Sequence, residues 1–359
     1  MRHGAPLADG APDLKGKRAL FSRLGAAGVG LVLALLVAEA VLRAIGFSFE
    51  LYPREVAFGW PTPQILRRHY RPDPDLFWVT RGYHRKLEAA RARRPDIVLM
   101  GCSVTELSDW GGRLAKLVAR EDGSPRILNL GVAGWSSYQG LRQLRRDVAP
   151  LRPRIALILY GWNDHWIGFG IEDKHVHRIN SVAYGLLRRS RLAQLVSRAW
   201  TELERTGRSG PLRRVSIEDF EANLEEMVEV ARSAGIEPVL LTAPTSHRRG
   251  HEPVYLRRRW LEDLSELVPL HRRYAAAVRS AAAANGAMLC DLASRFDELA
   301  TDERIDTWFG KDGIHPNAEG SRRIAEIVAD CLIRGGLVAD ARGAATGSDE
   351  AQASQRDLK

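Results

Sequence analysis

The amino-acid sequence predicts a three-layer α/β/α sandwich with a mostly parallel sheet, preceded by one N-terminal transmembrane helix. Three observations support this prediction. Short apolar stretches alternate with helical ones, polar residues and glycines follow the apolar stretches, and an uncharged apolar run lies near the N-terminus. A chain of 359 residues, 45% of them hydrophobic, can bury one large core, so we expect one main domain with appendages.

The N-terminal apolar run predicts a helix long enough to cross a bilayer. Its uncharged part, from Leu24 to Ala38, would cover about 22 Å as a helix, which is less than the roughly 30 Å of a hydrocarbon layer. Glu39 and Arg43 allow the helix to continue, because residues four apart can pair on one helix face. We therefore predict a single transmembrane signal-anchor helix over residues 24–46.

The charges around this helix predict its orientation. Residues 1–23 carry several lysines and arginines, and basic flanks stay on the cytoplasmic side of a membrane. The tail is then cytoplasmic, and the main domain lies on the extracytoplasmic side, periplasmic or extracellular. A cleaved signal peptide is the alternative, because "AEA" at residues 38–40 is typical of a cleavage site. The main domain is exported in both cases.

Composition divides the rest of the chain into three segments. Residues 47–95 are rich in proline and aromatic residues, which predicts a stalk or a cap. Residues 96–336 form the main domain. An insertion at about 165–214 does not follow its alternation of strands and helices. Residues 337–359 lack an apolar face, and we expect them to form a disordered tail.

Five short apolar runs predict the strands of the main domain. Each is apolar enough to be buried on both faces of a parallel sheet, and they begin at Asp96, Arg126, Arg154, Glu237 and Ala287. Between them, Ser216 to Gly235 has apolar residues at helical spacing, a serine at the capping position and a terminal glycine. This rhythm predicts right-handed βαβ crossovers and a doubly wound sheet.

The net charge and the cysteine content limit which binding partners, metal sites and disulfides the sequence predicts. The net charge of +9 comes largely from arginine runs, which are typical of a solvated surface, and no nucleic-acid-binding motif accompanies them. We expect no nucleic-acid partner, and the sequence leaves the oligomeric state open. The cysteines, Cys102, Cys290 and Cys331, are odd in number, and their spacing indicates neither a zinc site nor a disulfide framework.

The residues that follow the predicted strands form a set suited to ester hydrolysis. Ser103 follows the first strand, Gly131 the second and Asn163 the third, while Asp312 and His315 precede the last helix. A serine nucleophile needs a base, the base needs a carboxylate to orient it, and the oxyanion needs hydrogen-bond donors. His315 can be the base and Asp312 its orienter, since three residues across a turn bring them into reach.

Each of these residues also has an ordinary structural interpretation. Ser103 alone would be a helix cap, Gly131 a turn residue, Asn163 a loop residue, Asp312 a turn former and His315 a surface histidine. Their order along the chain and their common place at strand ends favour the catalytic interpretation, because ligand sites of open α/β sheets lie at the carboxyl ends of the strands.

At these positions the sequence resembles the SGNH (GDSL-like) hydrolases. "GCSVT" resembles their first block, "NLGVAG" the second, "YGWND" the third and "DGIHP" the last. The resemblance implies a flavodoxin-like sheet, no metal and no organic cofactor. It also implies a catalytic triad of Ser103, Asp312 and His315, with an oxyanion hole from Ser103, Gly131 and Asn163. Two residues depart from the family pattern: Cys102 replaces a frequent aspartate and Leu107 a frequent glycine.

Other sites fit the sequence less well. The nucleophile elbow of ordinary α/β-hydrolases requires a glycine two residues after the serine, where this chain has Thr105. Cys102 is a further candidate nucleophile, but the family pattern places the nucleophile at the next residue. Two histidine pairs, in "KHVHR" and "HRRGH", have ligand-like spacing without a carboxylate-rich partner. His165 either contacts substrate or packs beside the site.

Three functions remain open at this point. The first is an exported, membrane-anchored serine esterase that removes acyl groups, for example acetyl, from carbohydrate or envelope esters. The second is an O-acyltransferase that uses the same triad to acylate an envelope polysaccharide. The third is a non-catalytic module that binds an anionic glycan through its arginines.

Overall fold

The structure is a computed structural model that describes residues 14–49, 68–119, 123–166, 172–175, 189–206, 212–256, 261, 263–300 and 304–339. Its centre is a five-stranded parallel sheet in the order β4-β3-β5-β6-β7. The strands are β3 (Ile97–Gly101), β4 (Ile127–Asn129), β5 (Ile155–Leu159), β6 (Glu237–Leu241) and β7 (Met288–Cys290). β4, β5, β6 and β7 lie within the apolar runs that predicted them, and β3 extends one residue beyond its run, to Gly101.

The order of the strands determines which of the residues that follow them lie close together. Counted along the chain the order is 2-1-3-4-5, the flavodoxin-like arrangement. From β3 the chain adds β4 on one side and then β5, β6 and β7 on the other. The predicted fold class is therefore confirmed. β3 and β5 are central and fully buried, and their register pairs Ile97 with Ile155 and Gly101 with Leu159. Residues that follow β3 and β5 consequently emerge side by side at one edge of the sheet.

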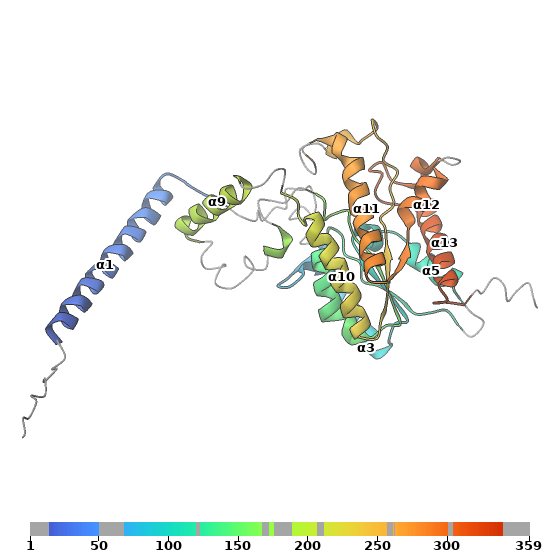
Figure 1. Cartoon of the computed structure of the whole chain (residues 1–359), viewed down its shortest axis with the longest axis horizontal. Coiled ribbons are helices and arrows are strands. Elements are labelled where there is room, and N and C mark those ends of the chain that lie inside the picture. The colour runs from blue at the N-terminus through green and yellow to red at the C-terminus, as the bar shows by residue number, and fades with distance from the viewer. Residues whose placement is uncertain are drawn as a thin grey trace, which may run out of the picture.

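Helices cover both faces of the sheet (Figure 1). On one face α10 (Ile217–Ser233) packs between α6 (Ser137–Gln143) and α11 (Leu267–Ala284). On the other, α13 (Ala318–Arg334) packs against α5 (Trp110–Leu117) and α12 (Leu292–Leu299). The predicted cap of α10 is present, since the Ser216 hydroxyl accepts the Asp219 N–H at 3.1 Å.

Short helical segments connect these elements. They comprise α4 (Ser103–Glu106), a π-helical segment (Leu144–Val148), and 3₁₀ turns at Ala149–Leu151, Val254–Leu256, Leu264–Glu266 and Ile305–Trp308.

Part of the predicted stalk or cap packs on the main domain. The hairpin of β1 (Tyr70–Asp73) and β2 (Phe77–Thr80) leads into α3 (Tyr83–Ala92). The Trp78 indole donates to the Ala133 carbonyl at 3.1 Å, and the Trp135 indole donates to the Trp78 carbonyl at 2.9 Å. This reciprocal pair fixes the hairpin beside the loop that follows β4.

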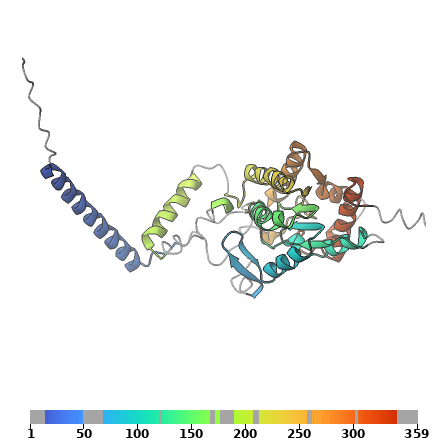
Figure 2. The same ribbon diagram turned by 90° about the horizontal axis from the view of Figure 1, so that it is seen from below.

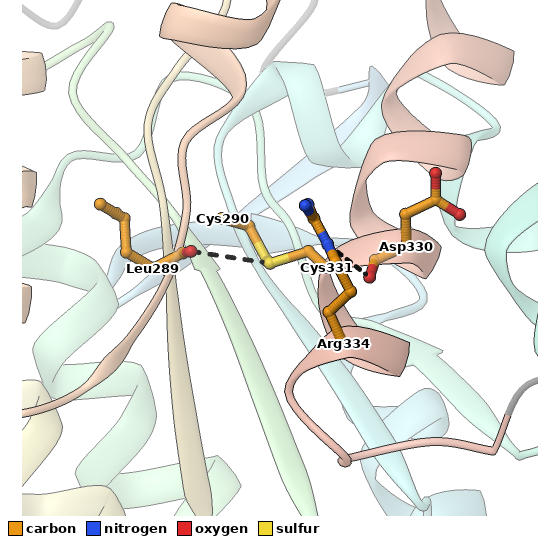
Figure 3. The surroundings of a disulfide bond; sticks show 5 residues. All are labelled: Leu289, Cys290, Asp330, Cys331 and Arg334. Atoms are coloured by element: carbon orange, nitrogen blue, oxygen red, sulfur yellow. Dashed lines mark hydrogen bonds between the residues drawn. A yellow bond between two sulfur atoms is a disulfide. The ribbon is translucent and has the colours of Figure 1, made fainter.

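Cys290 and Cys331 form a disulfide that the cysteine spacing did not indicate (Figure 3). The two residues are 41 positions apart, so no short motif connects them. They meet because β7 lies at the edge of the sheet beneath α13, and the bond joins the end of β7 to that helix. Cys102 is the free cysteine and is buried.

The N-terminal helix α1 (Leu14–Ala44) begins ten residues before the predicted span and ends two residues before its limit. Among the described residues, it is the one helix with a stretch long and apolar enough to cross a membrane, Gly25–Ala44, and that stretch is exposed. The same length and composition suit an anchor or a signal sequence. Of the predicted tail at 337–359, residues 340–359 lie outside the described residues, as do most of the cytoplasmic tail and parts of the predicted insertion. Leu337 and Val338, at the start of that predicted tail, pack against the core.

Candidate active site

Ser103 stands where β3 ends and α4 begins. Gly101 closes the strand, and a side chain there would place a carbon 2.7 Å from the Leu159 carbonyl, so only glycine fits between β3 and β5. Cys102 is the extended residue before the helix, and Ser103 is the first residue of α4. The Ser103 N–H therefore has no helical carbonyl to bind, and negative charge is favoured near such free N–H groups at the start of a helix.

The structure brings Ser103, His315 and Asp312 together in one hydrogen-bonded chain. The His315 Nε2 lies 2.7 Å from the Ser103 Oγ, and the His315 Nδ1 lies 2.6 Å from the Asp312 Oδ2. Ser103 is 212 residues away from His315 in the chain. Both distances are within hydrogen-bond reach, so this chain of contacts can move a proton from the hydroxyl to the imidazole.

Asp312 is held as an ionised carboxylate. Its Oδ1 accepts the backbone N–H groups of Ile314 and His315, each at 2.9 Å. Burial alone would raise the pKa of Asp312, but the hydrogen bonds from the side chain and backbone of His315 outweigh that effect and lower the pKa to about 2. The carboxylate is thus charged at neutral pH and fixes the imidazole with Nε2 toward the serine.

The loop after β6 holds in place the loop that carries Asp312 and His315. The His247 Nε2 donates to the Asp312 carbonyl at 2.6 Å, and the Thr245 hydroxyl donates to the Gly313 carbonyl at 3.0 Å. Gly313 has a φ of 68°, and a side chain there would place a carbon 2.6 Å from the His247 ring. Burial lowers the pKa of His247, which keeps it neutral with one N–H to donate. In the sequence, His247 stands out only as part of the histidine pair in "HRRGH", which has ligand-like spacing.

Asn163 lies at the predicted edge of the sheet, in the turn after β5. Its amide nitrogen donates to the Trp135 carbonyl at 3.0 Å. An amide has two N–H groups, so one remains to meet an oxyanion. The bond to Trp135 orients the side chain and joins the turn after β5 to the loop after β4.

The backbone N–H of Gly131 is not the free hydrogen-bond donor that the sequence predicted. Its N–H donates to the Asn129 Oδ1 at 2.9 Å, and the Asn129 amide donates to the Thr105 carbonyl at 2.6 Å. A side chain at Gly131 would place a carbon 2.8 Å from the Thr105 Cβ. Gly131 therefore also serves as a close packing point on α4, and an oxyanion would have to share its N–H with Asn129.

A buried carboxylate supports the turn that holds Asn163. Asp164 accepts the Ser137 N–H at 2.7 Å and the Gly161 N–H at 3.0 Å. Desolvation by burial raises the pKa of Asp164 to about 6, although the Ser137 bonds act in the other direction. This side chain fixes α6 against the turn after β5.

A buried ion pair supports the loop after β4. The Arg214 guanidinium lies 2.7 Å from Asp173 and donates to the Gly134 carbonyl at 2.6 Å, while the Ser136 hydroxyl donates to Asp173 at 2.6 Å. Arg214 and Asp173 belong to the predicted insertion and to its end, and both are buried. The insertion thus fixes the two residues that flank Trp135, whose carbonyl binds Asn163.

The other two candidate residues, Cys102 and His165, are both buried. Burial raises the pKa of Cys102 to about 11, so its thiol stays protonated and is a poor nucleophile. His165 is fully buried, lies 3.3 Å from His271 through their ring nitrogens and packs on Trp162, which favours the packing interpretation. Leu107, at the end of α4, is exposed. Among the described residues, no group of three or more His, Cys, Asp or Glu side chains could hold a metal ion. His177, of the pair in "KHVHR", lies outside the described residues.

Comparison with known proteins assigns the family. Residues 96–323 match the GDSL-like Lipase/Acylhydrolase family. Because the match covers well over half of the chain, the protein belongs to this family, and the resemblance found in the four sequence blocks is confirmed. The protein is a hydrolase that acts on ester bonds.

Solved structures match the chain at low sequence identity. A lipase/acylhydrolase from Enterococcus faecalis is 16% identical, covers 68% of this chain and 97% of its own, and has a TM-score of 0.44. A GDSL-like lipase from Bacteroides thetaiotaomicron is 18% identical, with 70% and 98% covered and a TM-score of 0.44. An acetylxylan esterase from Geobacillus stearothermophilus is 15% identical, with 67% and 93% covered and a TM-score of 0.42. No curated protein sequence matches the chain.

Proposed function

We propose that the protein is a serine esterase in which Ser103, His315 and Asp312 form the catalytic triad. The observation that carries this proposal is the pair of contacts at 2.7 Å and 2.6 Å that joins the three side chains. In the reaction the Ser103 oxygen attacks the ester carbonyl while His315 accepts its proton. The proton then passes to the departing alkoxide, which leaves an acyl group on Ser103. Water activated by His315 releases the acid and restores the serine.

The oxyanion of each tetrahedral intermediate would be bound by Ser103, Asn163 and Gly131. The Ser103 N–H and the second amide N–H of Asn163 are the two donors that the contacts leave available. The Gly131 N–H is a third donor and shares its hydrogen bond with Asn129. Donors fixed before the reaction stabilise the developing charge without rearrangement.

Export to the extracytoplasmic side and retention by α1 are part of the proposal. Disulfides persist in oxidising compartments, and the Cys290–Cys331 bond supports an exported domain. Glu39 of α1 accepts hydrogen bonds from residues 190–192, and cleavage after Ala40 would remove this contact. This favours the uncleaved anchor. We infer that the substrates are acyl esters, such as acetyl esters, of carbohydrate or other envelope polymers.

The test is covalent labelling of the full-length protein in detergent with a fluorophosphonate, followed by intact-mass analysis. One adduct on the wild type and none on Ser103→Ala would support an activated Ser103. A folded protein without an adduct would contradict the triad and favour the glycan-binding alternative. The intact mass also reports whether residues 1–40 are retained.

A second measurement separates hydrolysis from acyl transfer. Release of acetate from acetylated sugars is followed with and without unacetylated polysaccharide. An esterase releases acetate at a rate that the polysaccharide does not change. Acetylated polysaccharide formed at the expense of free acetate would replace the esterase proposal by the acyltransferase.

A further inference from the structure

Helix α9 (Arg191–Thr206) lies away from the α/β domain and against the end of α1 (Figures 1 and 2). Both views show the two helices meeting near the C-terminus of α1 and then diverging at an angle. α9 belongs to the predicted insertion between β5 and α10. Its position therefore connects a segment of the hydrolase domain directly to the N-terminal apolar helix.

Specific hydrogen bonds join the two helices. The Glu39 carboxylate accepts the Ser190 hydroxyl at 2.8 Å and the backbone N–H groups of Arg191 and Leu192, each at 2.9 Å. Free N–H groups at the start of a helix require such an acceptor, and the helix dipole favours a negative charge there. Arg43 pairs with Glu39 and donates to the Arg189 carbonyl at 2.8 Å. Glu39 is thus the cap of α9, supplied by another helix.

The two sides of α9 differ strongly in polarity. Apolar residues recur at a spacing of three or four along one side, at Leu192, Leu195, Val196, Ala199 and Leu203. Of these side chains, Leu195 is 39% exposed, Val196 63% and Leu203 69%. On the other side, Gln194 is buried and accepts the Phe49 N–H at 3.0 Å. One side of α9 is therefore apolar and exposed at Leu195, Val196 and Leu203, whereas the other side is polar and contacts the chain through Gln194.

The place of the contact along α1 is compatible with lipid as the partner of this apolar face, once α1 is taken as the membrane anchor. Glu39 precedes Ala44, the last residue of the apolar stretch, by five residues, which is about 7.5 Å along a helix. Amphipathic helices of the membrane interface lie about 5–10 Å into the boundary between headgroups and acyl chains. A helix fixed to Glu39 therefore starts at the depth of an interfacial helix.

We propose that α9 is an interfacial membrane helix, which lies in the lipid boundary with Leu195 and Val196 toward the acyl chains and is fixed to the anchor by Glu39. The proposal rests on the membrane anchoring by α1 proposed above. The sequence of α9 has three arginines against two glutamates, so binding depends on apolar contact and little on anionic lipid. The hydrolase domain is then attached to the bilayer at two places.

The test uses full-length protein reconstituted in phosphatidylcholine vesicles, with an environment-sensitive fluorophore on Val196→Cys. Arg198→Cys is the matched control, because Arg198 is exposed on the polar side of the same helix. The native thiols do not interfere, since Cys102 is buried and the other two cysteines are paired. We expect blue-shifted emission at position 196 and quenching by nitroxides near the lipid headgroup, with neither at position 198. Adding anionic lipid should change neither result.

The outcomes separate this inference from the anchoring proposal. Protein that floats with the vesicles while position 196 behaves like position 198 would overturn the interfacial helix and leave the anchor intact. Protein that does not float would overturn both. Shielding at position 196 that depends on protein concentration and not on lipid quenchers would identify a second copy of the chain instead. Glu39→Ala should reduce the blue shift at position 196 without reducing flotation, because only the attachment of α9 is lost.

Discussion

The acid–base side and the oxyanion side of the candidate active site are built in different ways. Asp312 and His315 lie in one short loop, three residues apart, and the aspartate is satisfied by N–H groups of that same loop. Asn163 and Gly131 lie in separate loops, whose positions depend on buried groups such as Asp164 and Arg214. The acid–base pair can therefore be predicted from its spacing, whereas the oxyanion donors come from separate loops that only the fold brings together.

The largest expected effect is on the acid–base side. Ser103→Ala and His315→Ala should each lower ester turnover roughly 10⁴-fold or more, and the double variant should be no worse than either, since triad members act as a unit. Initial rates with a short-chain ester measure the loss. The exposed residues Ser124 and His251 provide controls, and Ser124→Ala and His251→Ala should retain full activity. Additive losses in the double variant would show that the two residues act independently.

The buried ion pair on the oxyanion side should give the largest effect on stability. Arg214→Ala leaves Asp173 buried without its partner, which should lower the free energy of unfolding by about 3–5 kcal/mol. Arg304→Ala is the matched control, because its pair with Asp306 is exposed and should contribute about 0–1 kcal/mol. Denaturant titration of the two variants measures the difference. Equal losses at the two sites would mean that the burial of the Arg214 pair does not govern its contribution.

Asn163→Ala should lower kcat roughly 10²- to 10³-fold and leave KM nearly unchanged, because one oxyanion donor acts mainly in the transition state. Thermal unfolding should show that the variant is folded. Gly131→Ala should instead reduce stability as well, since its new carbon would approach the Thr105 side chain. A rise in KM with an unchanged kcat in Asn163→Ala would assign this side chain to substrate binding and not to the oxyanion.

The two sides should also differ in how stability depends on pH. The pKa of Asp164 is raised to about 6, so its contribution to stability is greatest below pH 4 and is lost as the pH rises from about 4 to about 6. The pKa of Asp312 is lowered to about 2, so its contribution is present above pH 4 and is lost as the pH falls from about 4 to about 2.

Denaturant titration from pH 2 to pH 7 of Asp164→Asn and Asp312→Asn tests this difference. The stability of the wild type relative to Asp164→Asn should fall by on the order of 2 kcal/mol between pH 4 and pH 6. Relative to Asp312→Asn it should fall when the pH decreases below 4. Curves that run parallel to the wild type at all pH values would contradict the environments described for the two carboxylates.

The sequence predicted the parts of the fold that depend on local pattern. The five strands lie where apolar runs of five to seven residues occur, and α10 lies between its capping serine and terminal glycine. It also located the candidate triad, because Ser103 and His315 occur in short motifs next to predictable elements. Burial on both faces of a sheet and capping of a helix act within a few residues, so the sequence carries their signal directly.

Contacts between distant segments could not be predicted in this way. The Cys290–Cys331 bond, the clamp of His247 on Asp312 and the cap that Glu39 supplies to α9 each join residues far apart in sequence. None has a spacing motif, because each depends on which elements the sheet order places together. The sequence likewise marked Gly131 as a donor, whereas the fold places its N–H against Asn129.

Local patterns in the amino-acid sequence were thus enough to predict the sandwich, the apolar N-terminal helix, the membership of the family and the positions of Ser103, Asp312 and His315 at strand or helix ends. The tertiary structure decided how these residues meet and what supports them. The physical reason is that hydrophobic pattern and capping are local, whereas hydrogen bonds between buried polar groups form only after the chain has collapsed and brought their partners together.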